Sequence, residues 1–411
     1  MIRNVVLAAG LASALVGCGG GGGGGGAVAT PSSTEENCSF YTGRQGSGEF
    51  APTNRIIALP KAGAVAGRVS GRLAQGRVRS HRALGHALVI ETDPAQRSQM
   101  IADLAADGDY EFVEEDGIAR RADAPIDPLI NLQWHLARIQ APDAWSAVGA
   151  GAASVPIAVI DSGIDPNHPE MAGRLLPGWN FLTGNTDTSD GLGHGTSVGG
   201  VAGAAANNGK GGAGVAWDSP LMPFVVLDSS DHAAYSDIMN AIVLAADRGV
   251  RVINVSLGGT TPSAGLQWAV DYAWLRGCIV IAAAMNNGSS TPMYPAACDK
   301  VIAVGATTQG DQLAGFSNYG SWVDLVAPGE GILTLIRGRC MRTRSGTSFS
   351  APMVAGVAAM VLAARSDLTV QELSDVLLAG CDDLGTVGTD DYFGVGRINA
   401  SRAVAAALLV P

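Results

Sequence analysis

Aromatic residues are scarce in this chain of 411 residues, and charged residues make up only 15% of it. Because Phe, Trp and Tyr together reach 5%, the core has to be built from Ala, Val, Ile and Leu. Such a composition suits strands that are buried on both faces, with 56 glycines allowing helices to pack closely. The length is sufficient for one large domain with accessory segments.

Positive charge is also in short supply, since the net charge is −11. The acidic excess falls in residues 122–411, which hold 14 Lys and Arg against 25 Asp and Glu. An acidic surface of this kind argues against nucleic acid as a partner. A basic cluster precedes that region, and it is either a solvated face or loop or a surface that docks on the acidic domain. Its members are Arg68, Arg72, Arg77, Arg79 and Arg82.

Apolar runs long enough to span a membrane are not evident after the N-terminus, because Gly, Pro and charge interrupt them. Arg3 and the short run Val5–Val16 are typical of a signal peptide over residues 1–17. The run ends in Leu15-Val16-Gly17-Cys18, which resembles the lipobox of bacterial lipoproteins. That resemblance implies a lipid on Cys18 and anchoring to the bacterial cell envelope, at the outer membrane or surface. The alternatives are an ordinary signal peptide with a chance Cys, or release outside the cell.

Cysteines are few, and export would place them in an oxidising compartment where they can pair. Cys278 and Cys298 bracket one strand and loop, whereas Cys340 and Cys381 bracket a later helix. We therefore expect these two pairs, with Cys38 left over. Connectivity does not follow from sequence alone, so the pairing rests on this bracketing only.

The segment after the signal peptide divides into a linker and a small unit. Residues 18–49 hold eight consecutive glycines and then Ser and Thr, a composition that behaves as a flexible tether. Residues 50–121 predict a small α+β domain with strands at Arg55–Leu59, Ala87–Glu91 and Tyr110–Glu114 and a helix at Pro94–Ala106.

Residues 122–411 alternate short apolar runs with helical patterns. This alternation predicts an α/β fold, a mostly parallel sheet with helices on both faces. The expected strands are Ile157–Ile160, Leu221–Val226, Val250–Val255, Ile279–Ala283 and Val301–Ala306. The expected helices are Thr196–Ala206, Tyr235–Arg248, Ala264–Leu275, Phe349–Ala364 and Val370–Leu378.

Three short segments place a reactive side chain beside glycines or at a helix start. Asp161 ends an apolar strand, His194 lies between two glycines, and Ser348 precedes Pro352, which fits the first turn of a helix. Taken singly, each has an ordinary explanation, as a turn former, a structural histidine or a helix cap. Taken together, they supply a nucleophile, a base and an orienting carboxylate.

Asp, His and Ser follow each other along the chain in the order that subtilisins have, whereas chymotrypsin-like enzymes and α/β-hydrolases have other orders. No Gly-x-Ser-x-Gly elbow, the motif of α/β-hydrolases, surrounds Ser348. From about Pro128 to the C-terminus, the chain resembles the subtilase family in all three boxes and their flanking residues. The resemblance implies a subtilisin-like fold and a secreted serine endopeptidase that hydrolyses proteins or peptides. Two rivals are a peptide-binding surface protein with weak catalysis and an esterase.

The resemblance also implies further site residues. Asn286, in Ala284-Met285-Asn286-Asn287-Gly288, matches the family's oxyanion donor. Ser256, Leu257 and Gly258 match the strand on which the family binds the substrate backbone. The segment Val113–Gly117 before Arg120-Arg121 resembles the end of a subtilase propeptide. Residues 50–121 would then inhibit the enzyme until the precursor cuts itself within Arg120–Asp127; a small stand-alone domain with another role is the alternative.

Two methionines depart from the family pattern. Met285 stands where the family usually has Gly, and Met293 stands before Tyr294-Pro295 where a small residue is common. Both positions border the pocket for the residue before the cut. We therefore expect a shallow apolar pocket that favours small or medium aliphatic side chains.

A calcium site is the one cofactor site that the resemblance implies, since catalysis itself needs no cofactor. The loop 206–212 aligns with the calcium loop of subtilisins, and Glu170 aligns with a carboxylate ligand. An oxygen cage would consist of the side chains of Glu170 and Asn208 and the carbonyls of Ala206, Lys210 and Gly212. An Asn- and Gly-rich turn without a metal is the alternative.

Overall fold

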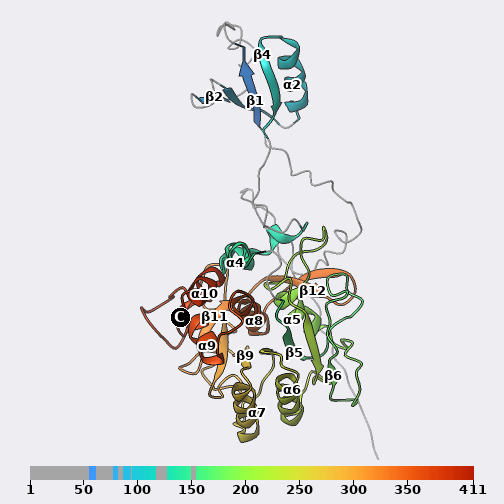
Figure 1. Ribbon diagram of the computed structural model, residues 1–411, viewed down its shortest axis with the longest axis vertical. Coiled ribbons are helices and arrows are strands. Elements are labelled where there is room, and N and C mark those ends of the chain that lie inside the picture. Colours follow the sequence, from blue (N-terminus) through green and yellow to red (C-terminus); the bar gives the residue numbers. More distant parts are fainter. Residues whose placement is uncertain (1–54, 62–76, 82–86, 94, 117–126, 150–153) are drawn as a thin grey trace, which may run out of the picture. The chain divides into compact units, whose positions relative to one another are not determined.

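The structure is a computed structural model that describes residues 55–61, 77–81, 87–93, 95–116, 127–149 and 154–411 (Figure 1). The expected signal peptide, Cys18, Cys38, the glycine linker and most of the expected processing region lie outside the described residues. Two parts of the chain fold, a small unit within residues 55–116 and a large domain from residue 127 onward.

The small unit is a four-stranded antiparallel sheet with one helix. In spatial order its strands are β2 (Arg77–His81), β3 (Ala87–Glu91), β1 (Arg55–Pro60) and β4 (Tyr110–Glu115), and the helix is α2 (Arg97–Ala106). Leu104 of α2 packs with Ile56, Ile90 and Tyr110 in a compact apolar core. The predicted α+β unit is thus present. Strand β2 was not predicted, because its sequence is mostly polar and basic, and two arginines of the basic cluster lie in it.

A seven-stranded parallel sheet forms the centre of the large domain. Its spatial order is β11 (Leu325–Pro328), β10 (Val301–Thr307), β9 (Ile279–Ala283), β8 (Val252–Val255), β5 (Ile157–Asp161), β7 (Leu221–Val225) and β6 (Trp179–Asn180). Strands β6 and β7 lie on one side of β5, and the later strands β8 to β11 lie on the other side. Such a switch point places the carboxyl end of β5 beside a crevice, where ligands bind in open α/β sheets.

Both faces of this sheet are covered by helices, so it separates two cores (Figure 1). Ile157 and Val159 of β5 face one core, whereas Ala158 and Ile160 face the other, as the two-residue period of a strand requires. The first core contains helices α4 (Ala141–Val148), α5 (His194–Gly203), α8 (Thr347–Ala364), α9 (Val370–Ala379) and α10 (Ala400–Ala407). The second contains α6 (Tyr235–Asp247) and α7 (Ala264–Leu275). The predicted α/β architecture is confirmed.

Helix α8 is almost entirely buried in the first core. It is long and apolar enough to cross a membrane, but 89% of its apolar window is buried inside the protein, as in a core helix. Gly356 lets α8 approach α5, because a Cβ there would lie 2.6 Å from Val215 Cβ and 3.1 Å from the Ala202 oxygen. Pro352 lies two residues deeper in the helix than predicted, because the helix already begins at Thr347.

Several elements were missed from the sequence. They are the short helices η3 (Ile130–Leu132) and α3 (Trp134–Arg138), the helices α4 and α10, strands β6 and β11, and the hairpin β12 (Ile332–Ile336) with β13 (Cys340–Arg344).

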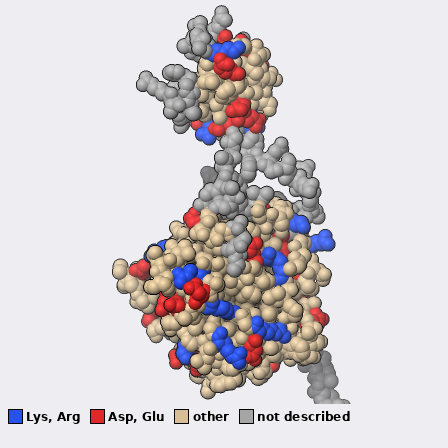
Figure 2. All heavy atoms as spheres, in the orientation of Figure 1, with Lys and Arg blue, Asp and Glu red and all other residues tan. Residues whose placement is uncertain are grey.

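On the face drawn in Figure 2, acidic and basic side chains lie next to each other, and most of the surface carries neither. The net negative charge is therefore not gathered into one patch on that face.

Both expected cysteine pairs are wrong. Cys278, Cys298 and Cys381 are free, buried thiols, and Cys340 is disulfide-bonded, so neither expected pair forms. Bracketing a strand or a helix says nothing about whether two sulfur atoms can meet, because a disulfide needs close and properly directed Cβ atoms. Burial raises the pKa of the Cys278 and Cys298 thiols to about 11 and that of Cys381 to about 12, so these thiols stay protonated.

Candidate active site

Asp161 and His194 are joined at the carboxyl edge of the sheet. Asp161 ends β5 and is completely buried, and both its carboxylate oxygens lie 2.9 Å from His194 Nδ1, which donates. Oδ1 also accepts from the backbone N–H of Ser162 at 2.7 Å. A buried carboxylate needs such donors. The contact fixes the imidazole with its other nitrogen, Nε2, directed away from Asp161.

Asp190 holds the start of the helix that carries His194. Its Oδ1 accepts from the Ser162 hydroxyl and the Gly193 backbone N–H, each at 2.7 Å, and its Oδ2 accepts from the N–H and hydroxyl of Thr196. Gly193 itself has a φ of +91°, which glycine adopts without strain. Asp190 was missed from the sequence. The available signal was an acidic residue just before a helix start, where free N–H groups need acceptors.

The imidazole of His194 is more basic than an ordinary histidine. Burial is the largest influence and lowers its pKa, but the charge and hydrogen bond of Asp161, aided by the charges of Asp231 and Asp190, raise the pKa above the usual value. Opposite charge nearby stabilises the protonated ring. An imidazole of this kind is suited to take up a proton.

Ser348 lies in the first turn of α8 and is 6% exposed. Its hydroxyl donates to the Ser256 carbonyl oxygen at 3.1 Å, and the Ser256 hydroxyl donates to the Ser348 carbonyl oxygen at 3.1 Å. Pro352, four residues further along, has no N–H to offer that carbonyl. The serine is therefore held by a neighbouring strand end as well as by its own helix.

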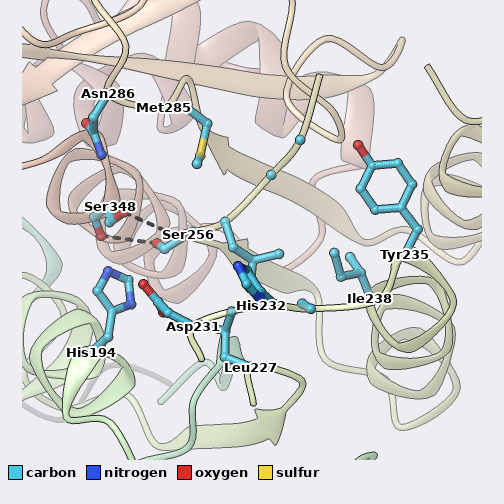
Figure 3. Close-up of a pocket in the computed structure, with 14 residues that line it drawn as sticks. His194, Leu227, Asp231, His232, Tyr235, Ile238, Ser256, Met285, Asn286 and Ser348 are labelled. Carbon is cyan, nitrogen blue, oxygen red and sulfur yellow. Dashed lines mark hydrogen bonds between the residues drawn. The ribbon is translucent and has the colours of Figure 1, made fainter. Parts of the chain in front are cut away.

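Figure 3 shows His194 and Ser348 facing the same cleft. The three side chains predicted as a triad therefore do converge, although the Ser348 hydroxyl donates to Ser256 and not to His194. Hydrogen bonds of this kind often form fully only when substrate is bound. Rotation about the Cα–Cβ bond of Ser348 is the motion that would redirect its hydroxyl.

Asn286 presents an amide N–H to the same region. Its Oδ1 accepts from the backbone N–H of Thr347 at 2.8 Å and from the Thr347 hydroxyl at 3.1 Å. The Nδ2 group is left to point toward Ser348, as Figure 3 shows. The site thus combines a serine, a base and an amide donor fixed in place before any substrate arrives.

Met285 adopts a left-handed backbone conformation with φ of +74°. This region is costly for residues with a Cβ and free for glycine, which gives a physical reason for the glycine usual at this position. The Met285 side chain lines the cleft, and its Cγ lies 3.6 Å from where a Cβ on Gly258 would stand. Its predicted contact with the residue before the cut stays a prediction.

The segment Ser256–Gly258 follows β8 and lines the cleft. A Cβ on Gly258 would come within 2.9 Å of the Tyr294 oxygen, so a larger residue does not fit. Met293 is 5% exposed and is not among the described residues that line the cleft, so its predicted role in the pocket stays a prediction. The other lining residues were not predicted from the sequence; they are Leu227, Asp231, His232, Ala233, Tyr235, Ile238 and Gly259.

The predicted calcium ligands Glu170 and Asn208 do meet. Glu170 is fully buried, and its Oε2 accepts from Asn208 Nδ2 at 2.9 Å. Asn208 Oδ1 accepts from the Lys210 N–H at 2.9 Å. Asp127, which was missed, accepts backbone N–H groups of the same loop, including that of Gly209 at 2.9 Å.

This donor set fits a calcium ion, because carboxylate, amide and carbonyl oxygens are the ligands it prefers. It does not fit a metal that needs several His, Cys or carboxylate ligands, and the described residues contain no group of three such side chains. The carbonyl contributions of Ala206, Lys210 and Gly212 stay predictions.

Comparison with known proteins shows which family the chain resembles. A family model described as the subtilase family matches residues 152–396. The chain is 40% identical over 282 residues to "Thermitase" of Thermoactinomyces vulgaris, which covers 68% of this chain and 99% of that protein. It is 38% identical over 308 residues to "Subtilisin NAT" of Bacillus subtilis subsp. natto, covering 74% and 77% respectively.

A solved structure is also similar. It is titled as proteases from Pseudoalteromonas arctica PAMC 21717, and the match has a TM-score of 0.63 at 30% identity. The match covers 69% of this chain and 99% of that structure. The shared part corresponds to the large domain in extent.

Proposed function

The chain belongs to the subtilase family and is a subtilisin-like serine endopeptidase, and we propose that Ser348, His194, Asp161 and Asn286 carry its chemistry. Ser348 Oγ attacks the carbonyl carbon of a peptide bond while His194 Nε2 takes the hydroxyl proton. The imidazolium then gives this proton to the departing amine. Water, deprotonated by the same nitrogen, hydrolyses the resulting ester on Ser348.

Asp161 and Asn286 act on the two charges that develop. Asp161, bonded to Nδ1, holds the ring and stabilises the imidazolium. Asn286 Nδ2 and the Ser348 backbone N–H donate to the oxygen that becomes negative in the tetrahedral intermediate. The observation that carries this proposal is the anchoring of Asn286 Oδ1 by Thr347, which aims the opposite end of the amide at the serine.

A fluorophosphonate probe tests the assignment, because it reacts only with an activated serine. The wild-type enzyme should be labelled and should cleave casein, whereas Ser348→Ala should do neither. Labelling that persists in Ser348→Ala would place the nucleophile elsewhere. Absence of labelling in the wild-type enzyme would favour the weakly catalytic peptide-binding rival, and preference for a short-chain ester over casein would favour the esterase.

The precursor would process itself. The small α+β unit would act as an inhibitory propeptide, and a cut within Arg120–Asp127 would release the large domain. Ser348→Ala should therefore accumulate at full length when it is produced in a host that lacks other proteases. Normal maturation of that variant in such a host would refute self-processing.

Export and lipid attachment complete the proposal. The sequence before residue 19 supports cleavage ahead of Cys18 and a lipid on its sulfur, which would anchor the enzyme to the cell envelope through the glycine linker. Cys18→Ser should move the protein from the detergent phase to the aqueous phase in a detergent partition experiment. N-terminal mass analysis of the mature protein would identify both the cleavage site and the lipid.

Calcium binding is also proposed, through Glu170, Asn208 and the carbonyls of the loop 206–212. A bound ion would add stability to the folded state, because the unfolded chain holds no such cage. Its contribution is to stability, and no catalytic step depends on it.

A further inference from the structure

The cleft contains one acidic side chain that the proposed chemistry does not use. Among the described residues that line it together with Ser348, Asp231 is the one carboxylate, and no Lys or Arg joins it. Asp231 is exposed, and its carboxylate makes no hydrogen bond or ion pair with the described residues. An uncompensated charge in a substrate cleft is available to a charged group of the substrate.

A tight turn holds Asp231 in place. Oδ1 of Asp228 accepts from the backbone N–H of Ser230 at 2.8 Å and of His232 at 3.1 Å, and the Asp228 N–H donates to the His232 oxygen at 2.8 Å. Within this closed turn Asp231 adopts φ of +63°, a conformation that aspartate tolerates better than most residues. The direction of its Cα–Cβ bond is therefore set by the backbone.

The charge of Asp231 is felt at the reacting histidine. It is one of the charges that raise the His194 pKa, which places it within electrostatic reach of the ring. Figure 3 shows the carboxylate beside His194, on the opposite side of Ser256 from Met285. A substrate side chain on that side would lie between the ring and the Asp228–His232 turn.

The alternation of side chains along an extended substrate peptide identifies which substrate residue faces Asp231. If the substrate backbone pairs with Ser256–Gly258, successive side chains point to opposite sides. The residue just before the cut faces Met285, and so the residue before that one faces Leu227 and Asp231. Leu227 is apolar and lines the same cleft, so it can pack on the aliphatic stem of a long basic side chain.

We propose that Asp231 makes this enzyme prefer peptides with Lys or Arg two residues before the cleaved bond. The inference rests on the proposed roles of Ser348 and of Ser256–Gly258. The preference is local to this side of the serine. The adjoining hollow, which shares His194, Asn286 and Ser348, is lined by Arg344 and holds no carboxylate among its described residues.

The experiment compares kcat/KM for fluorogenic peptides that differ only at that position, with Lys, Ala or Glu there. At low ionic strength we expect Lys to exceed Ala by about 3-fold and Glu by about 10-fold, the range of an exposed charge pair. High salt should reduce these ratios, because exposed charges are screened. Asp231→Asn should bring the Lys-to-Glu ratio close to that of the high-salt measurement.

Asp237→Asn is the matched control. It removes the same charge from the first turn of α6, outside the residues that line the cleft, and should keep the wild-type ratio. Equal rates for Lys and Glu in the wild-type enzyme, or an unchanged ratio in Asp231→Asn, would overturn the proposal. Cleavage of the Ala peptide shows that the proteolytic function holds in either case, whereas failure to cleave any peptide or to react with the fluorophosphonate would refute that function instead.

Discussion

Ser256 and Ser348 bond to each other twice, each hydroxyl donating to the other's carbonyl oxygen at 3.1 Å. The bond from the Ser256 hydroxyl to the Ser348 carbonyl forms because Pro352 leaves that carbonyl without a helical N–H donor. The strand end that would bind substrate and the helix start that carries the proposed nucleophile are thereby tied together. The Ser348 hydroxyl can leave its bond during the reaction, whereas the Ser256 hydroxyl can stay.

Ser256→Ala should destabilise the enzyme by about 1–2 kcal/mol, because it leaves the Ser348 carbonyl oxygen buried and unpaired. Thermal unfolding would measure this loss. Pro352→Ala restores an N–H to that carbonyl, so the double variant should lose less stability than the sum of the two single variants. If the stability losses of the two single variants add up exactly in the double variant, the bond from Ser256 to the Ser348 carbonyl does not contribute to stability.

Asn286→Ala should lower kcat by about 100- to 1000-fold with a small change in KM, because its amide is used in the transition state. Steady-state kinetics on one fluorogenic peptide would measure both. The fluorophosphonate should still label Ser348 slowly in this variant, which separates lost stabilisation from a collapsed site. A loss confined to KM would contradict the assignment.

The pH dependence of kcat/KM should follow His194. The proposed base works as the neutral imidazole, so activity rises as the pH rises through the His194 pKa. Asp231→Asn removes a charge that raises this pKa, and the acid limb of the profile should therefore move to lower pH. The shift should be smaller at high salt than at low salt, because salt screens the charge of Asp231. A limb that moves to higher pH would contradict this electrostatic relationship.

Met285→Gly should widen the pocket and relieve the left-handed strain at φ of +74°. We expect the ratio of cleavage after Phe to cleavage after Ala to rise about 10-fold, roughly the effect of 1.4 kcal/mol. Peptide libraries scanned at the position before the cut would show this. If the wild-type enzyme already cuts mainly after Phe, Tyr or basic residues, the expectation of a shallow aliphatic pocket is wrong.

Removal of calcium should lower the melting temperature, and returning calcium should restore it. At a free calcium concentration 100 times the Kd, the ion adds about 2.7 kcal/mol. Glu170→Gln, which removes the predicted carboxylate ligand, should melt at the same temperature with and without a chelator. If the wild-type enzyme is equally indifferent to the chelator, calcium does not bind.

The sequence predicts the central sheet well because its strands are buried on both faces and read as continuous apolar runs. Val301–Thr307, for example, is fully buried and was found within one residue. By contrast, β6 is only two residues long, and β13 is an arginine-containing strand at the surface. Neither has a pattern that distinguishes it from a loop.

The proposed site residues were found because each lies in a short local pattern of glycines and a strand or helix end. Asp190 was missed although it stands just before a helix start, because its role depends on a network that only folding closes. Asp231 has no such local pattern, since it acts through its place at the tip of a turn. Cysteine pairing was wrong for a related reason. Whether Cys278 can reach Cys298 depends on Cβ positions, which spacing along the chain does not determine.

The first residue of α5 is His194, and Ser348 stands in the first turn of α8, so the separation of base and nucleophile depends on how closely these two helices lie. That separation is limited by Gly356, about 12 Å along α8 from Ser348, where the Val215 side chain leaves no room for a methyl group and the Ala202 oxygen of α5 would be in tight contact with it. A single added carbon deep in the interior would therefore slow proteolysis without touching any residue of the cleft. The catalytic rate of this enzyme therefore depends on how closely α5 and α8 pack in the interior, far from the cleft.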